Sequence, residues 1–147
     1  MNKHRSSLNC IVPPYMLREI VEHGTMEQRQ QALRNIVSAE AVRVQREVIA
    51  KEGPPEPLME AAGGLNRIIY TADNGSTLPG RELRGEGGAP TGDPAADEAY
   101  DGAGATYSLF SEIFNRDSID DSGLRLDSTV HFRTGYDNAF WNGRQMV

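Results

Sequence analysis

A breaker near the middle of the chain, Gly-Pro-Pro-Glu-Pro at residues 53–57, separates two stretches of different pattern. Proline fixes φ and has no amide hydrogen, so this segment cannot continue a helix or lie in a central strand. Before it, apolar residues recur at helical spacing; after it, several runs alternate as strands do. The sequence therefore predicts an α+β protein with a helical arm, residues 1–55, and a second unit, the body, residues 56–147.

The arm is predicted to begin as an extended chain. Pro13 and Pro14 restrict φ and disfavour helical geometry in the residue before them, which indicates extended structure over residues 1–14. A short helix is predicted over residues 15–23, because Gly24 is a favourable residue just after a helix.

A longer helical stretch follows in the arm. Thr25 and Gln28 have the three-residue spacing of a capping box, which predicts that one or two amphipathic helices occupy residues 25–52. Apolar side chains at helical steps predict the buried face. These side chains belong to Leu33, Ile36, Val37, Val44 and Val48.

The body is predicted to combine strands with one long helix. Asn74 and Gly75 suit a tight hairpin turn, because both residue types tolerate positive φ. Asp93 followed by Pro94 is typical of a helix start, and the pattern behind it predicts a helix over residues 94–115.

Two strands are predicted near the end of the chain. Residues 124–132 alternate between apolar and polar types, which predicts a strand with one buried face and one polar face. Residues 138–147 indicate a further strand. Gly102 and Gly104 each cost about 1 kcal/mol inside a helix, so we expect a sheet to lie close against them, where no side chain fits.

Charge and composition exclude several kinds of partner. The net charge is −6, and residues 53–147 carry seven Lys and Arg against fifteen Asp and Glu. Such an acidic body lacks the basic face of a nucleic-acid-binding protein. No apolar run reaches about 18 residues, so no membrane-spanning segment is predicted. The start lacks the apolar run of a secretory signal, so we expect synthesis in the cytoplasm.

The sequence predicts neither a metal site nor a catalytic residue in this chain. Cys10 and the three histidines lie far apart and lack zinc-ligand spacing. The adjacent carboxylates at 97–98 and 120–121 lack the spacing of a calcium loop, so we expect solvated helix and turn positions. His131 lies on the polar side of its predicted strand, which indicates a surface or half-buried side chain.

The first candidate site is the proline-rich segment of the arm. A rigid segment with apolar and aromatic neighbours can lie in a groove as a pre-ordered strand at low entropic cost. The alternative is that it packs on its own helix. The segment consists of Cys10, Ile11, Val12, Pro13, Pro14 and Tyr15.

The second candidate site is the stretch before the end of the chain. An asparagine side chain offers both a donor and an acceptor, as needed to hold a peptide unit, and a strand edge beside it can pair with an extended peptide. The alternative is an ordinary strand with an aromatic core contact. The residues are Asn138, Ala139, Phe140 and Trp141.

These residues carry a resemblance to a known family. The run Tyr-Asp-Asn-Ala-Phe-Trp-Asn-Gly at 136–143, together with residues 97–132, resembles the N-terminal part of thermolysin-like zinc metallopeptidases. The stretch Leu-Asn-Cys-Ile-Val-Pro-Pro-Tyr at 8–15 and the helices after it resemble the short propeptide of the protealysin subgroup. The resemblance implies a helical propeptide and a partial N-terminal subdomain, with a twisted, mainly antiparallel sheet and one long helix.

The resemblance also implies roles for both sites. Asn138 and Ala139 would bind the main chain of a peptide or protein substrate, while Phe140 and Trp141 would line or brace the substrate cleft. Residues 10–15 would plug this cleft through an intramolecular contact between propeptide and catalytic domain. Because the family acts outside the cell, the resemblance implies export by a route other than the Sec signal.

The chain departs from the family at the zinc site. In relatives, two histidines of an H-E-x-x-H helix and a later glutamate hold zinc, which activates the water that hydrolyses the peptide bond. Relatives could also bind calcium. This sequence has no H-E-x-x-H, so we expect the N-terminal portion of a zinc endopeptidase precursor, inactive alone. Two alternatives are a stand-alone binding or inhibitor module acting on an intact peptidase, and an inactive remnant.

Overall fold

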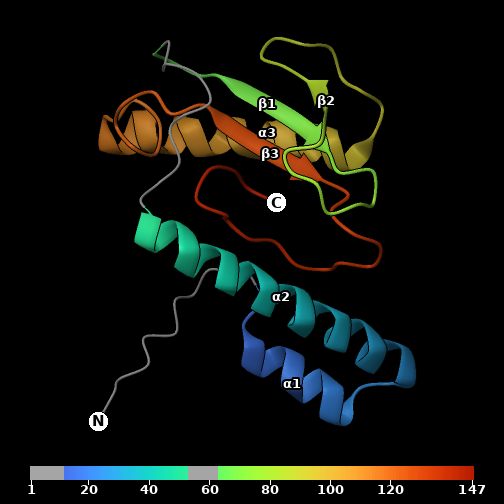
Figure 1. The fold of residues 1–147 in the computed structure, drawn as a ribbon. Helices are drawn as coiled ribbons and strands as arrows, with labels where there is room; N and C mark the ends of the chain where they lie inside the picture. Colours follow the sequence, from blue (N-terminus) through green and yellow to red (C-terminus); the bar gives the residue numbers. More distant parts are fainter. Residues whose placement is uncertain (1–11, 53–62) are drawn as a thin grey trace.

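A computed structural model describes residues 12–52 and 63–147, and the ribbon shows a helical arm beside a small sheet (Figure 1). The predicted α+β class is confirmed. Two helices form the described arm, and three strands with one long helix form the part of the body that the structure describes. In chain order the elements are α1 (Pro14–His23), α2 (Met26–Glu52), β1 (Arg67–Thr71), β2 (Arg81–Arg84), α3 (Pro94–Ser108), the π-turn η1 (Leu109–Ile113) and β3 (Leu126–Val130).

The arm is a pair of packed helices. Most of the predicted extended stretch, residues 1–11, lies outside the described residues. Pro13 is extended, and Pro14 is already the first residue of α1, a position that needs no amide hydrogen. The predicted capping box is confirmed: the Thr25 amide donates to Gln28 Oε1 at 2.8 Å, and the Gln28 amide donates to Thr25 Oγ1 at 3.3 Å. It starts one long helix, α2, rather than two.

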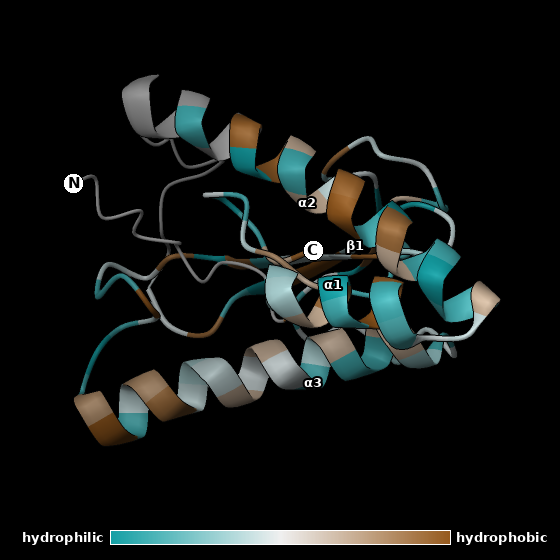
Figure 2. Ribbon diagram, turned by 90° about the horizontal axis from the view of Figure 1, so that it is seen from below, coloured by the Kyte–Doolittle hydropathy of each residue, from teal (hydrophilic) through white to brown (hydrophobic). Residues whose placement is uncertain are grey.

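The predicted buried face of α2 is wrong at three of its five positions, while Ile36 is half-buried and the side chain of Val48 lies outside those that the structure describes. Leu33, Val37 and Val44 are 50%, 68% and 61% exposed, and hydrophobic residues alternate with hydrophilic ones along α2 (Figure 2). The face that α2 buries contains small and polar side chains as well as one valine. It comprises Ala32, Asn35, Ser38, Ala39 and Val42. These positions also recur at helical steps. Because α2 contacts the body through hydrogen bonds as well as apolar side chains, a prediction from hydrophobicity alone selected the wrong face of the helix.

The sheet has the order β2-β1-β3. β1 is antiparallel to β2 and parallel to β3, with Arg67 opposite Leu126 and Thr71 opposite Val130. The sheet of the described residues is therefore mixed rather than mainly antiparallel. A parallel pair requires a long crossover, and residues 94–113, with α3, supply it.

The turn after β1 is shifted by one residue from its predicted position. Asp73 and Asn74 have φ values of 47° and 63°, and the Gly75 amide closes the turn on the Ala72 carbonyl at 2.7 Å. Positive φ at both central residues is the signature of a type I′ turn. The turn does not lead straight into β2, because the Asn74 amide instead donates to the His131 carbonyl at 2.9 Å.

α3 covers one face of the sheet and buries the first core of the body (Figure 2). The predicted helix start is confirmed, since Asp93 Oδ1 accepts the Ala95 amide at 3.1 Å. Ala96 and Tyr100 pack against Ile69 of β1. The expected lack of space for a side chain holds for Gly104 and not for Gly102. A Cβ on Gly104 would meet the Arg67 guanidinium, whereas a Cβ on Gly102 would meet nothing within 4 Å.

β3 is buried on both faces, contrary to the predicted polar face. Asp127 and Thr129 are only 7% and 4% exposed. Arg125 Nε donates to Asp127 Oδ1 at 2.7 Å, and Thr129 Oγ1 donates to the Pro79 carbonyl at 2.8 Å and accepts from Gln145. The side chains of Asp127 and Thr129 can be buried because each is hydrogen-bonded, so the alternation of apolar and polar residues does not place the polar face of β3 in solvent.

The prediction of a strand over 138–147 is wrong: this stretch turns back on itself and makes isolated bridges, Trp141 with Met146 and Met146 with Ser128. The amide of Phe140 donates to the Val147 carbonyl, and that of Val147 to the Phe140 carbonyl, each at 2.9 Å. This return brings Met146 to the outer edge of β3, where the Thr129 amide donates to the Met146 carbonyl at 2.8 Å. Residues 131–147, hereafter the carboxyl segment, thus run between β3 and α2 (Figure 1).

Candidate functional site

The carboxyl segment joins the arm to the body through an apolar cluster. Three aromatic rings, those of Phe132, Tyr136 and Phe140, lie edge to face, with centroids 5.4 to 6.0 Å apart. Val42 of α2 is 6% exposed and packs in the same cluster. Edge-to-face aromatic pairs add about 0.5–1.5 kcal/mol each beyond their buried area, so this cluster firmly supports the segment on which Asn138 lies.

Asn138 holds the main chain of the arm by both ends of its side-chain amide. The Val12 amide donates to Asn138 Oδ1 at 3.0 Å, and Asn138 Nδ2 donates to the Val12 carbonyl at 3.4 Å. The Ala139 amide also donates to Asn138 Oδ1, at 2.8 Å, which orients the side chain. The arrangement is capable of binding one residue of an extended peptide without regard to its side chain.

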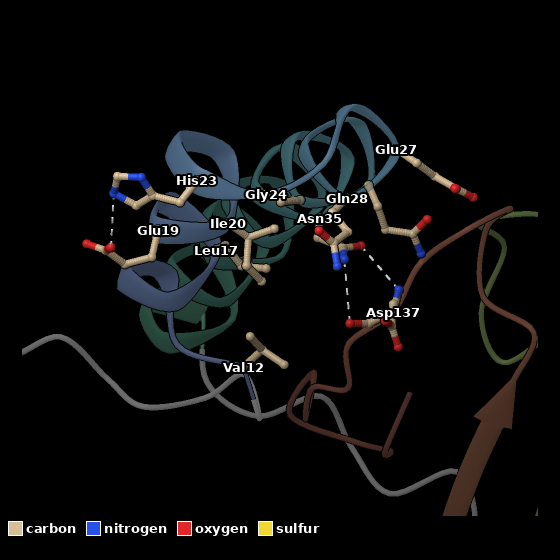
Figure 3. Close-up of a pocket in the computed structure, with 12 residues that line it drawn as sticks. Val12, Leu17, Glu19, Ile20, His23, Gly24, Glu27, Gln28, Asn35 and Asp137 are labelled. Carbon is tan, nitrogen blue, oxygen red and sulfur yellow. Dashed lines mark hydrogen bonds and ion pairs between the residues drawn. The ribbon is translucent and has the colours of Figure 1, made fainter.

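α2 makes a second set of polar contacts with the carboxyl segment. Asn35 is 3% exposed. Its Oδ1 accepts a hydrogen bond from the Asp137 amide at 3.2 Å, and its Nδ2 donates to the Asp137 carbonyl at 3.5 Å (Figure 3). Arg133 Nη1 donates to Ser38 Oγ at 3.0 Å. Sequence reasoning missed Asn35 and Ser38. Their only signal in the sequence was that two polar residues lie three positions apart, on one face of the predicted helix.

The remaining residues of the predicted plug have different places. Cys10 and Ile11 lie outside the described residues. Pro13 is extended, with ψ of 147°, and caps α1, whose first residue is Pro14. Tyr15 is 65% exposed. Within the described arm, Val12 is therefore the residue of the plug that hydrogen-bonds to Asn138.

The other predicted binding residues flank Asn138 in different environments. Ala139 is half-buried, and its amide is used by Asn138. Phe140 is 1% exposed and lies in the aromatic cluster. Trp141 is half-buried and forms a β-bridge with Met146. The structure thus brings Asn138 and Val12 together, while Phe140 faces the core.

The carboxylates and His131 have structural partners. His131 Nε2 lies 2.7 Å from Asp93 Oδ2, and this hydrogen bond, with that from Ala95, lowers the pKa of Asp93. Backbone hydrogen bonds from Thr91 and Gly92 lower the pKa of Asp97. Asp120 Oδ1 accepts two backbone amides of its own turn.

The described residues do not form a metal centre. Among the side chains that the structure describes, no three from His, Cys, Asp or Glu are grouped so that they could hold an ion. These residues therefore do not fit the zinc that the family resemblance implies. No helix in the described part of the chain is long and apolar enough to cross a bilayer.

Comparison with known proteins identifies the family to which this fold and site belong. The family model for the thermolysin metallopeptidase catalytic domain matches residues 66–147, more than half of the chain. The chain therefore belongs to the thermolysin metallopeptidases, and the resemblance stated from the sequence is confirmed.

Individual relatives extend the similarity into the arm. The solved precursor of protealysin, a metalloproteinase from Serratia proteamaculans, is 42% identical with a TM-score of 0.75, over 94% of this chain and 37% of that one. An extracellular metalloprotease of Pectobacterium carotovorum subsp. carotovorum is 44% identical over 93% of this chain and 38% of the relative. Protease PrtS of Photorhabdus sp. (strain Az29) is 34% identical over 100% and 40%.

The similarity covers the arm and the body together. It corresponds to the N-terminal portion of a metalloprotease precursor. The chain spans about two fifths of the length of these relatives.

Proposed function

We propose that this chain supplies the substrate-binding edge and the inhibitory arm of a zinc endopeptidase precursor. In this proposal, Asn138 and Ala139 bind the main chain of a peptide or protein substrate. In the precursor, residues 10–15 of the arm occupy this substrate-binding position instead. Phe140 braces the edge from the core side, and Trp141 lines it. The zinc, its ligands and the catalytic base would come from a part of the relatives that this chain does not span.

The observation that carries the proposal is the paired hydrogen bond between Asn138 and Val12. Main-chain donors and acceptors are common to all peptides, so a side-chain amide that holds both serves substrates of many sequences. The same contact made by the arm excludes a substrate from that position. The name of the Pectobacterium relative, an extracellular metalloprotease, also favours export of the whole protein.

The arm acts as an inhibitor rather than a substrate because of the residues after Val12. Pro13 has no amide hydrogen with which to continue a ladder, and the chain enters α1 at Pro14. The extended conformation that a protease requires of its substrate therefore ends at Pro13, one residue beyond Val12.

A chimera tests the proposal. Residues 1–147 would be joined to the remainder of the Pectobacterium metalloprotease, and hydrolysis of a peptide would be measured after removal of the arm. We expect Asn138→Ala to lower kcat/KM by about ten- to a hundredfold, since two hydrogen bonds to the substrate main chain are lost. Before removal of the arm, the same variant should show a larger fraction of its own activity after removal than the parent chimera does, because the arm also loses its two hydrogen bonds to Asn138.

Thr134→Ala is the matched control, because Thr134 is exposed in the same segment. It should leave both activities within about twofold of the parent, a difference of less than 0.5 kcal/mol. An Asn138→Ala enzyme with unchanged kcat/KM, in a folded chimera, would remove the basis of the proposal.

A further inference from the structure

The arm and the body hold each other through two reciprocal asparagines. Asn138 of the body binds the amide and carbonyl of Val12, and Asn35 of the arm binds the amide and carbonyl of Asp137. Asp137 and Asn138 are neighbours in the chain. The two amide side chains therefore fix adjacent residues of the carboxyl segment, one by contact with α2 and one by contact with Val12, which lies two residues before α1.

The space beside these contacts is not filled by packed side chains. A cavity of about 600 Å³ lies between α1, α2 and Asp137, with Val12, Leu17 and Ile20 among its apolar lining residues (Figure 3). A close-packed core fixes relative positions through shape, but an open cavity does not. The position of Val12 on Asn138 must therefore be set by other contacts.

Asn35 is the described residue best placed to set it. It lies on the docking face of α2 with Ser38 and Val42, which contact Arg133 and the aromatic cluster. α1 packs on α2, with Leu17 and Ala32 both buried. Whatever fixes α2 against Asp137 thus also fixes the start of α1, and Val12 precedes that start by two residues.

We propose that Asn35 is a positioning residue that sets the register of the arm on the body, so that Val12 and no other residue meets Asn138. The proposal rests on the proposed role of Asn138 as a main-chain-binding residue. A slip in one direction would place Pro13 or Pro14 at Asn138, and neither has an amide hydrogen to donate. A slip in the other direction would place Ile11 there, and Asn35 is what opposes it.

Amide hydrogen exchange of the full 147-residue chain, followed by NMR, tests this role. In the wild-type chain the Val12 amide should exchange at least about tenfold more slowly than in an unfolded peptide, because it donates to Asn138. Asn35→Leu keeps the branching and the number of side-chain heavy atoms and favours the helix, but it removes both hydrogen bonds to Asp137. We expect Val12 protection to fall to within about twofold of the unfolded rate, while amides of β1 and β3 stay protected.

Gln30→Leu is the matched control, because it makes the same kind of change on the exposed side of α2. It should leave Val12 protected. Asn35→Asp is a second variant that keeps the shape and an acceptor but cannot donate to the Asp137 carbonyl when ionised. If Asn35→Leu loses amide protection throughout the chain, the protection of Val12 in Asn35→Asp tests the positioning role instead.

The outcomes separate the two proposals. Val12 protection that survives both Asn35 variants, with the side-chain amide signals of Asn138 unmoved, overturns the positioning role alone. A Val12 amide that is unprotected in the wild-type chain overturns both this role and the main-chain grip of Asn138. A loss confined to Val12 in the Asn35 variants, with β1 and β3 intact, is the result we expect.

Discussion

Asp93 holds two separate parts of the body with one carboxylate. Its Oδ1 accepts the Ala95 amide and caps α3, and its Oδ2 lies 2.7 Å from His131 Nε2. His131 has a φ of 54°, and the next residue is Phe132 of the aromatic cluster. The carboxylate thus connects the start of α3 with the segment that carries Asn138.

The two functions of Asp93 can be separated by two substitutions. Asp93→Ala removes cap and pair, and should lower the free energy of unfolding by about 1 kcal/mol or more. Asp93→Asn keeps a good cap but loses the negative charge that His131 contacts. Urea unfolding of both variants and the wild type measures the two contributions.

The charge contribution depends on pH in a definite direction. The pKa of Asp93 is lowered in the folded state, first by the hydrogen bond with His131. The stabilisation is therefore present above the unfolded pKa of about 3.9 and is lost as pH falls through the lower folded pKa. The difference between wild type and Asp93→Asn should shrink between about pH 5 and about pH 3; a difference that grew on acidification would contradict this account.

Among the elements, α3 is joined to the sheet by a stacked charged cluster. The guanidinium groups of Arg67 and Arg84 lie 3.7 and 3.6 Å from the ring centroid of Tyr100. Arg67 also forms two hydrogen bonds with Glu86, which is the main reason that the pKa of Glu86 is lowered. The Arg67 side chain occupies the space beside Gly104, where a side chain on α3 would otherwise lie.

The two glycines of α3 should respond oppositely to alanine. Gly102→Ala adds a methyl group in open space, so the gain in helix propensity should raise the free energy of unfolding by about 0.5–1 kcal/mol. Gly104→Ala gains the same propensity, but its Cβ would displace the Arg67 guanidinium from Glu86 and Tyr100. We expect this variant to be less stable than wild type in the same urea experiment. Equal stabilisation by both would show that Arg67 moves aside freely.

For the molecule as a whole, the arm is a structural partner of the body as well as a proposed plug. Val42 packs against Phe132 and Phe140, and Val147 contacts the same cluster. α2 hydrogen-bonds to Asp137 and Arg133 of the carboxyl segment, while its contacts with named elements are with α1 and not with the strands. The arm therefore supports the segment on which substrate binding is proposed.

The whole chain should bind no zinc tightly. It contains no H-E-x-x-H, and its described residues group no three metal ligands. Calorimetric titration with zinc should give no stoichiometric site of the affinity typical of protein zinc centres, about 10–16 kcal/mol in structural sites. Tight binding of one equivalent of zinc, which a chelator then removes, would mean that this chain holds the reactive centre itself.

Local sequence signals predicted the elements of this protein well. Thr25 and Gln28 indicated the start of α2, and Asp93 with Pro94 indicated the start of α3, because capping depends on residues only two or three positions apart. The run around Asn138 indicated the family, and its amide suggested a residue that binds main chain. The boundary predicted between residues 55 and 56 lies outside the described residues and stays a prediction.

Long-range contacts decided what the local patterns could not. Asp127 and Thr129 are buried because the carboxyl segment returns across β3 and supplies partners such as Gln145. Asn35, rather than Leu33 or Val37, faces the body because Asp137, 102 positions away, offers main-chain groups there. The sequence by itself determined the helices, the strand β3 and the family, since those depend on near neighbours, whereas the strand predicted over 138–147 is not formed. Only the tertiary structure decided which faces meet, because burial of a polar group depends on a partner that no local pattern contains.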